Sequence, residues 1–171
     1  MTQILKTDYL VAGAGAMGMA FVDTLLSETE ADIIIVDRHA KPGGHWNDAY
    51  PFVKLHQPSA FFGVASRELS RFEIDQTGLN KGLFDLASGA EVSAYYDEVM
   101  QHRFLASGRV RYFPMCDFQV GGFDGKGHFR SLTTGEIYQV ETRKLVNATK
   151  LTVDVPSTHT PPFTVADGVQ F

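Results

Sequence analysis

The pattern of apolar and polar positions predicts a strand, a helix and a second strand near the start of the chain. Residues 9–12 form a short apolar run that leads directly into the glycine-rich residues 13–18. Apolar side chains then recur at helical spacing from Met19 to Leu26. Residues 33–36 are continuously β-branched, as in a parallel strand buried on both faces. We therefore expect one βαβ unit here.

The pattern beyond this unit predicts an irregular segment followed by a second helix. Residues 38–81 show no regular period and are punctuated by proline and glycine. Ser88 and Glu91 then have capping-box spacing, and apolar residues follow on one helical face. Gly108 stands where a helix ends. A helix is therefore expected over about 91–107.

Strand patterns dominate the last third of the chain. Residues 110–113 and 145–148 are short apolar runs, and residues 118–142 alternate short runs with glycine turns, which indicates a small antiparallel meander. The predicted fold class is α/β: a Rossmann-like, doubly wound parallel sheet with this meander as an insertion. We expect a single FAD/NAD(P)-binding domain over residues 1–150. Residues 151–171, which are rich in proline, are expected to be a tail or a linker to a missing downstream region.

Composition narrows the class of protein. The chain has 171 residues, 20 acidic against 15 basic, a formal net charge of −5 and 44% hydrophobic residues. These values indicate a globular core and argue against a nucleic-acid partner. The single cysteine, Cys116, excludes an intramolecular disulfide framework and a Cys-x-x-Cys metal or redox pair. A reducing, cytoplasmic location and no metal site are the expectation.

No segment has the length of a membrane span. The most apolar stretch, residues 9–22, is broken by three glycines and ends at Asp23, whereas a spanning helix needs about 20 apolar residues. Lys6 followed by an apolar run imitates a secretory signal, but the glycines fit a folded nucleotide-binding turn better. We expect no membrane partner.

The glycines of residues 13–18 have the Gly-x-Gly-x-x-Gly spacing of a dinucleotide fingerprint. Gly13 would allow the tight turn, Gly15 would let the backbone approach a pyrophosphate, and Gly18 would let helix and strand pack closely. The alternative is an ordinary α/β turn. The position after a strand and before a helix favours nucleotide binding.

Residues next to these glycines complete the predicted site. The free N–H groups at the helix start, at Ala16 and Met17, would face the phosphates together with the positive end of the helix dipole. Asp37, at the end of the second strand, can bind the ribose hydroxyls of the adenosine half. Arg38 can meet the adenine side or a phosphate, although a solvent-exposed arginine is the favoured interpretation.

Residues 41–46, Lys-Pro-Gly-Gly-His-Trp, carry a family resemblance. Together with the fingerprint and the acidic residue, they resemble the FAD-binding N-terminal domain of two-dinucleotide-binding-domain flavoproteins. The Gly-Gly-His-Trp form is similar to the Gly-Gly-x-Trp of flavin-containing and Baeyer–Villiger monooxygenases, and Tyr50-Pro51 follows as in that group. The resemblance implies that Gly43 and Gly44 pass close to the FAD pyrophosphate. It places Trp46 beside the isoalloxazine ring; a core tryptophan under a long loop is the alternative.

The resemblance extends to the later strands. Residues 110–116 match a strand whose last apolar residue lies against the adenine, which would place Cys116 there; ordinary apolar packing is the alternative. The meander matches the family's β-excursion. Residues 144–149 match a late strand that ends in Ala-Thr-Gly over the FAD, so Ala148 is implied as a cofactor contact. This chain departs from that signature because Lys150 replaces the glycine.

Other side chains have weaker functional interpretations. His56 and Gln57 can hydrogen-bond the polar edge of a flavin, although a loop histidine with ordinary polar partners is the favoured interpretation. Tyr95 and Tyr96 are most simply core. The glycines of residues 122–127 have the wrong order for a second fingerprint and indicate β-turns. The missing Cys-x-x-Cys argues against the disulfide-reductase branch. We assign no catalytic acid or base.

The expected function is that of the FAD-binding domain of a flavin-dependent oxidoreductase, monooxygenase-like, at the front of a longer enzyme. The full-length enzyme would use NAD(P)H as co-substrate and act on a small-molecule substrate. Two alternatives remain at this point: a plain NAD(P)-binding oxidoreductase domain, and a non-catalytic nucleotide-binding module.

Overall fold

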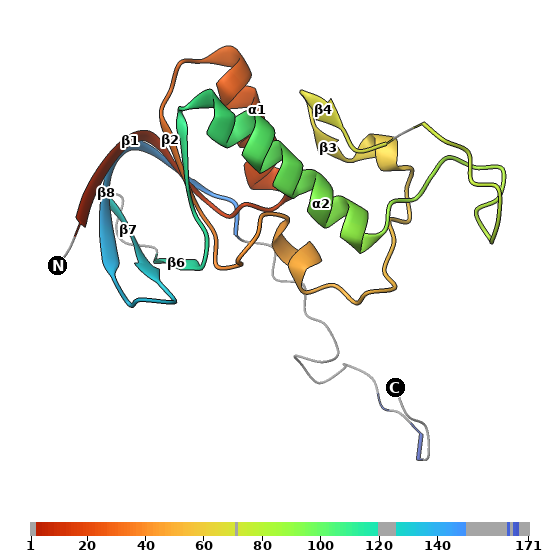
Figure 1. Cartoon of the computed structure of the whole chain (residues 1–171). Helices are drawn as coiled ribbons and strands as arrows, with labels where there is room; N and C mark the ends of the chain where they lie inside the picture. The colour runs from red at the N-terminus through yellow and green to blue at the C-terminus, as the bar shows by residue number, and fades with distance from the viewer. Residues whose placement is uncertain (1–2, 71, 120–125, 150–163, 165, 168–171) are drawn as a thin grey trace.

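The fold is built on a six-stranded, mostly parallel sheet (Figure 1). The computed structural model describes residues 3–70, 72–119, 126–149, 164 and 166–167. The strands are β1 (Gln3–Ala12), β2 (Ile33–Val36), β5 (Val110–Phe113), β6 (Cys116–Gln119), β7 (Lys126–Ser131) and β8 (Ile137–Asn147). Their order in the sheet is β5-β2-β1-β8-β7-β6. The strands β5, β2, β1 and β8 are parallel, and β7 pairs antiparallel with both β8 and β6.

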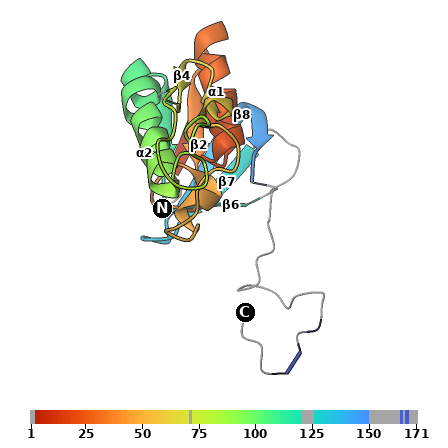
Figure 2. The ribbon, with the colours of Figure 1, turned by 90° about the vertical axis from the view of Figure 1, so that its right-hand side faces the viewer.

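Two α-helices lie against one face of this sheet, as Figures 1 and 2 show from two directions. They are α1 (Ala16–Glu28) and α2 (Gly89–Val99). Their apolar faces pack on every second residue of the parallel strands, such as Val11, Ile33 and Ile35, in one buried cluster. This alternation follows from the two-residue period of side chains along a strand.

The antiparallel strands curl back and cover part of the other face of the sheet. Leu10, Ile34 and Val36 form a second buried cluster with residues of β6, β7 and β8. Gly127 on β7 comes so near to Leu10 that a Cβ on the glycine would lie 2.3 Å from the leucine Cδ2. The predicted fold class, a Rossmann-like α/β sheet with an antiparallel meander, is confirmed. In the described residues, the meander covers part of this second face.

The second helix begins at its predicted cap. The Ser88 hydroxyl accepts a hydrogen bond from the N–H of Glu91, and the Glu91 carboxylate accepts one from the N–H of Ser88 at 2.7 Å. The helix then continues as a π-turn, η3 (Met100–Phe104), and a 3-10 turn, η4 (Leu105–Ser107). It ends at Gly108, whose φ of 71° is the left-handed conformation that favours glycine.

The strands β1 and β8 are longer than the apolar pattern indicates. The two pair in parallel from Gln3↔Tyr138 to Ala12↔Asn147, so the last strand of the meander and the predicted strand 145–148 are one continuous element. Most side chains in the first half of β1 and in β8 are exposed or half-buried, and in β8 only Val140 is buried. Because so few side chains are buried there, these parts of the strands lack the continuous apolar run that marks a buried strand in the sequence.

The segment between β2 and α2 is mostly irregular, as predicted. It contains the 3-10 turns η1 (Gly44–Asn47) and η2 (Ser59–Phe61) and a short hairpin of β3 (Gly63–Val64) and β4 (Arg67–Glu68). The hairpin is held by Asp23, a fully buried carboxylate on α1 that accepts a hydrogen bond from the N–H of Ser66 at 2.9 Å. Beyond the hairpin, the yellow-green loop extends away from the sheet (Figure 1).

Candidate dinucleotide site

The fingerprint turn connects β1 to α1 at the carboxyl end of the parallel strands. The N–H of Gly13 donates to the carbonyl of Val36 at 2.8 Å, which ties the turn to β2. Gly13 has a φ of 102°, and a Cβ there would lie 3.1 Å from the backbone carbonyl of Ala148. Glycine is required at this position because a side chain would be strained in conformation and tight against β8.

The N-terminus of α1 is open to an anion. Its N-cap residue, Gly15, offers no side-chain cap, and the first turn contains no acidic residue. Ala16 and Met17 are exposed, while Gly18 is buried against the turn. The first N–H groups of a helix lack intrahelical acceptors, and the helix dipole places partial positive charge there. This end of α1 therefore suits a phosphate.

A second glycine turn lies directly on the first. The N–H of Gly43 donates to the carbonyl of Ala14 at 2.8 Å. A Cβ on Gly44 would lie 2.9 Å from the Cα of Gly15, so the two backbones meet without room for a side chain on Gly44. Gly43 and Gly44 have φ values of 119° and 58°, the region that favours glycine. The structure thus brings together the two glycine motifs that the sequence singled out.

Asp37 lies beneath the fingerprint turn and is almost completely buried, with 5% of its side chain exposed. Its Oδ2 accepts a hydrogen bond from the N–H of Ala14 at 2.6 Å, and its Oδ1 accepts one from the N–H of His39 at 2.8 Å. A carboxylate oxygen can accept more than one hydrogen bond. Asp37 therefore fixes the turn, and its predicted contact with a ribose stays a prediction.

His39 is the residue of this site that the sequence pattern did not reveal. Its Nδ1 lies 2.8 Å from Oδ1 of Asp37, and its Nε2 lies 2.9 Å from Oδ2 of Asp48. Partial burial acts to lower the pKa of His39, but the hydrogen bonds to Asp48 and Asp37 outweigh it and raise the pKa above 6.5. No periodic signal marks such a contact, because both partners lie in or beside an irregular loop.

Trp46 packs at the start of α2. The indole is partly buried against the larger core cluster, and its Cε3 would lie 3.6 Å from a Cβ on Gly89. The ring of His45 lies 5.4 Å from it, centroid to centroid. This is the packing expected of a core tryptophan, and a contact with a flavin stays a prediction. Tyr95 and Tyr96 are buried, as predicted.

The backbones of Cys116 and Ala148 are hydrogen-bonded to residues next to the fingerprint turn. The N–H of Cys116 donates to the carbonyl of Asp37 at 2.9 Å, and the N–H of Ala148 donates to that of Ala12 at 2.8 Å. The Cys116 side chain is buried, and burial raises the pKa of its thiol. Lys150 and the glycines at 121, 122 and 125 lie outside the described residues.

Three predicted candidates stand on the surface. Arg38, the arginine for which solvent exposure is the favoured interpretation, is exposed, and so are His56 and Gln57.

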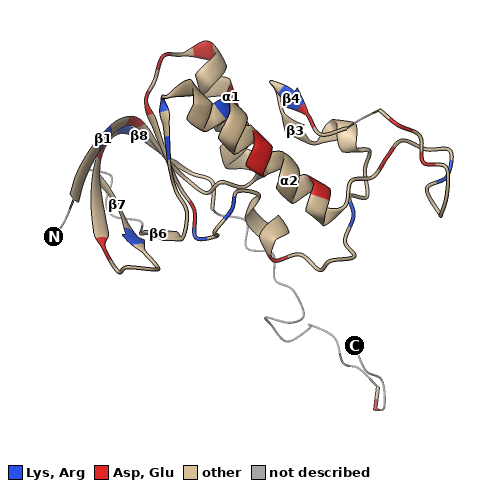
Figure 3. Ribbon diagram, in the orientation of Figure 1, with Lys and Arg blue, Asp and Glu red and all other residues tan. Residues whose placement is uncertain are grey.

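Acidic and basic residues are interspersed along the ribbon (Figure 3). In the part of the chain that the structure describes, no group of three or more His, Cys, Asp or Glu residues is placed to hold a metal ion. Nor does any described helix combine the length and the apolarity of a bilayer span.

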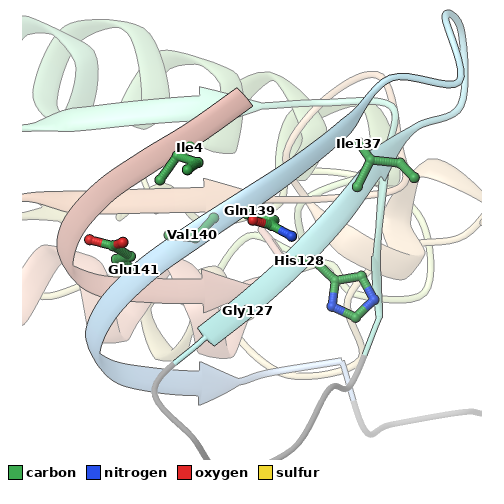
Figure 4. Close-up of a pocket in the computed structure, with 7 residues that line it drawn as sticks. All are labelled: Ile4, Gly127, His128, Ile137, Gln139, Val140 and Glu141. Carbon is green, nitrogen blue, oxygen red and sulfur yellow. The ribbon is translucent and has the colours of Figure 1, made fainter. Parts of the chain in front are cut away.

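A separate hollow of about 440 Å³ lies over β1, β7 and β8 (Figure 4). It is lined by Ile4, Gly127, His128, Ile137, Gln139, Val140 and Glu141. Ile4 lies near the start of β1, whereas the fingerprint turn follows its last residue, Ala12. At about 3.3 Å per residue along a strand, the hollow is distant from the glycine turns, and none of the predicted site residues lines it.

The strand–glycine turn–helix–strand unit, extended by β5 and β8, defines a Rossmann-like α/β fold, and solved structures share it. A flavin-containing monooxygenase from Stenotrophomonas maltophilia superposes with a TM-score of 0.61 at 21% identity, over 85% of this chain and 38% of its own. A cyclohexanone monooxygenase from Rhodococcus bound to NADP+ superposes with a TM-score of 0.56 at 24% identity, over 86% of this chain and 27% of its own. A bacillithiol disulfide reductase from Staphylococcus aureus has the same fold at 15% identity, with a TM-score of 0.59 over 85% and 38%.

Sequence comparison gives nearer relatives without an assigned activity. Uncharacterized proteins from Mycobacterium tuberculosis and Mycobacterium bovis are 50% identical over 165 residues, which is 96% of this chain. The chain spans 30% of the length of these relatives. No family model matches the sequence. The comparisons therefore show a fold that this chain shares with a flavin-containing monooxygenase, a cyclohexanone monooxygenase and a bacillithiol disulfide reductase.

Proposed function

We propose that this chain is the FAD-binding domain of a flavin-dependent, monooxygenase-like oxidoreductase that takes NAD(P)H as reductant in its full-length form. The observation that carries the proposal is the contact between the two glycine turns, in which the N–H of Gly43 donates to the carbonyl of Ala14. A domain that binds only NAD does not need a second glycine pair there. The fold likeness to flavin monooxygenases supports the same choice.

The residues around the fingerprint turn fit a dinucleotide. The bare backbone of Gly15 and the N–H groups of Ala16 and Met17 would hold the pyrophosphate, because no side chain caps this helix end. Asp37 would accept hydrogen bonds from a ribose, and its carboxylate would repel a ribose 2′-phosphate. This favours FAD or NAD over NADP at this turn.

Bound FAD would supply the redox chemistry by accepting a hydride from NAD(P)H, while the protein supplies placement. Gly43 and Gly44 would keep the loop close to the pyrophosphate because neither has a side chain to hold it away. The substrate oxidised in the full-length enzyme would be a small organic molecule. The described residues carry no assigned catalytic acid or base.

The experiment is a titration of the purified chain with FAD and, separately, with NAD+. We expect a yellow protein whose visible absorption persists after desalting. Uptake of NAD+ with no uptake of FAD would instead identify an NAD-binding domain. A folded chain that binds neither cofactor would support a non-catalytic module.

Gly15→Ala is the decisive variant. Gly15 has an ordinary φ of −80°, and the new Cβ would lie 3.4 Å from its nearest neighbour, the Cα of Gly44, so the fold should persist. The methyl group would obstruct the phosphate approach, and we expect FAD to bind roughly tenfold more weakly, or about 1.4 kcal/mol. Gly89→Ala is the matched control, since its Cβ would make ordinary contacts at 3.6 Å. Equal affinity in both variants would contradict the proposed site.

A further inference from the structure

His39 joins two carboxylates that belong to different parts of the candidate site. Asp37 closes β2 and accepts the N–H of Ala14 in the fingerprint turn, whereas Asp48 follows η1 in the loop of the second glycine turn. The His39 side chain is 21% exposed, and its partners Asp37 and Asp48 are 5% and 72% exposed. One half-buried ring thus spans the space between the two loops.

The hydrogen-bond pattern identifies the protonation state in which both contacts form. An ionised carboxylate only accepts hydrogen bonds, and a neutral imidazole has a single N–H to donate. Only the imidazolium can donate to Asp37 and to Asp48 at the same time. Hydrogen bonds between charged partners are also roughly twice as strong as neutral ones.

We propose that His39, as an imidazolium, is a positioning residue of the dinucleotide site, which holds Asp37 under the fingerprint turn and ties the second glycine loop to it through Asp48. The inference rests on the proposed function. Loss of the proton would leave one ring nitrogen facing a carboxylate without a hydrogen to share. It would also remove the cation that offsets Asp37 next to the pyrophosphate. Cofactor affinity should therefore fall as the pH rises.

Other groups around this pair do not supply a competing titration near neutral pH. Tyr112 on β5 and Cys116 on β6 are close to Asp37, and burial raises the pKa of both, so both stay neutral. The N–H of Met115 donates to the carbonyl of His39, which involves no titratable side chain. Arg38 and Lys41, in the same loop, are exposed.

The test compares FAD binding to the wild-type chain, to His39→Gln and to His102→Gln from about pH 6 to about pH 9, a range that covers a histidine pKa raised above its ordinary value. His102 is an exposed histidine on η3 and serves as the matched control. We expect wild type and His102→Gln to lose affinity roughly tenfold across this range, as for one lost charge-assisted bond. His39→Gln should bind weakly at low pH, with an affinity that changes little with pH. An identical pH profile in all three proteins would overturn the inference.

A second measurement separates this inference from the proposed function. Imidazole ¹⁵N NMR of the chain without cofactor should show both ring nitrogens of His39 protonated at neutral pH, and the Asp48→Asn variant should lose this signature. A neutral His39 ring in the wild type would overturn the inference even if FAD binds. A doubly protonated ring in a chain that takes up no FAD at any pH would overturn the proposed function and leave the link between the loops standing.

Discussion

The Cα of Gly18 faces the backbone of Gly13 so closely that a Cβ on Gly18 would lie 1.9 Å from the Gly13 carbonyl oxygen. The first turn of α1 and the end of β1 therefore touch through their main chains. The obstructing atom is backbone, which cannot rotate away as a side chain can. This contact fixes the angle at which α1 leaves the sheet, and with it the direction of the helix N-terminus.

Gly18→Ala should consequently destabilise the whole chain. The added methyl group forces the helix and the strand apart, an overpacking that costs about 3 kcal/mol or more. Urea denaturation followed by circular dichroism measures the loss, with Gly89→Ala as the control that should stay within about 1 kcal/mol of wild type. A Gly18→Ala protein as stable as wild type would show that α1 does not pack as described.

Arg109→Ala should weaken the end of α1. The Arg109 guanidinium donates to the carbonyl of Leu26 at 2.7 Å and to that of Thr29, and so supplies partners to the C-terminal carbonyls of the helix. Its loss should cost about 2 kcal/mol. Arg143→Ala is the comparison, because Arg143 is 82% exposed in its pair with Asp8 and should cost less than about 0.5 kcal/mol. Thermal unfolding of the two variants measures both losses of stability. Equal losses would contradict the role of Arg109 in capping α1.

The stability of the cofactor-free chain should fall as the medium becomes alkaline. The pKa of His39 is raised above its unfolded value of 6.5, so the folded state binds the proton more tightly than the unfolded state does. The corresponding stabilisation is fully present below about pH 6.5 and is lost as the pH rises through the folded pKa. Chemical denaturation at several pH values should show this slope in wild type and a smaller one in His39→Gln. A slope that the substitution leaves unchanged would mean that other groups carry it.

Tyr112→Phe should make the chain slightly more stable. Among the described residues, the Tyr112 hydroxyl has no hydrogen-bond partner although it is buried, and burial raises the pKa of the phenol. Removal of an unpaired buried polar group should recover about 1 kcal/mol. Calorimetry of the cofactor-free variant tests this, with Tyr95→Phe as the opposite case. The Tyr95 hydroxyl accepts a hydrogen bond from the N–H of Val64 and donates one to the backbone carbonyl of Arg67, so its removal should destabilise the chain.

Local signals account for what the sequence could predict. The fingerprint needs three glycines at a fixed spacing, and the α2 cap needs Ser88 and Glu91, so both can be recognised from neighbouring residues. Asp23 is different: it interrupts an apolar helical pattern, and its burial is explained by two later partners, Ser66 from the hairpin and Arg103 from η3. The His39–Asp48 contact likewise depends on the path of an irregular loop. Such pairings are set by tertiary geometry, for which one sequence offers no period.

The pairing of β1 with β8 has a consequence for synthesis of the chain. Gln3 pairs with Tyr138 and Ala12 with Asn147, so β1 is bordered by β8, a strand that leaves the ribosome much later. Only the β2 side of β1 can form early, and the other edge must wait until β8 has been synthesised. During that interval the nascent chain has an open strand edge, the kind of surface that chaperones protect and that misassembly exploits.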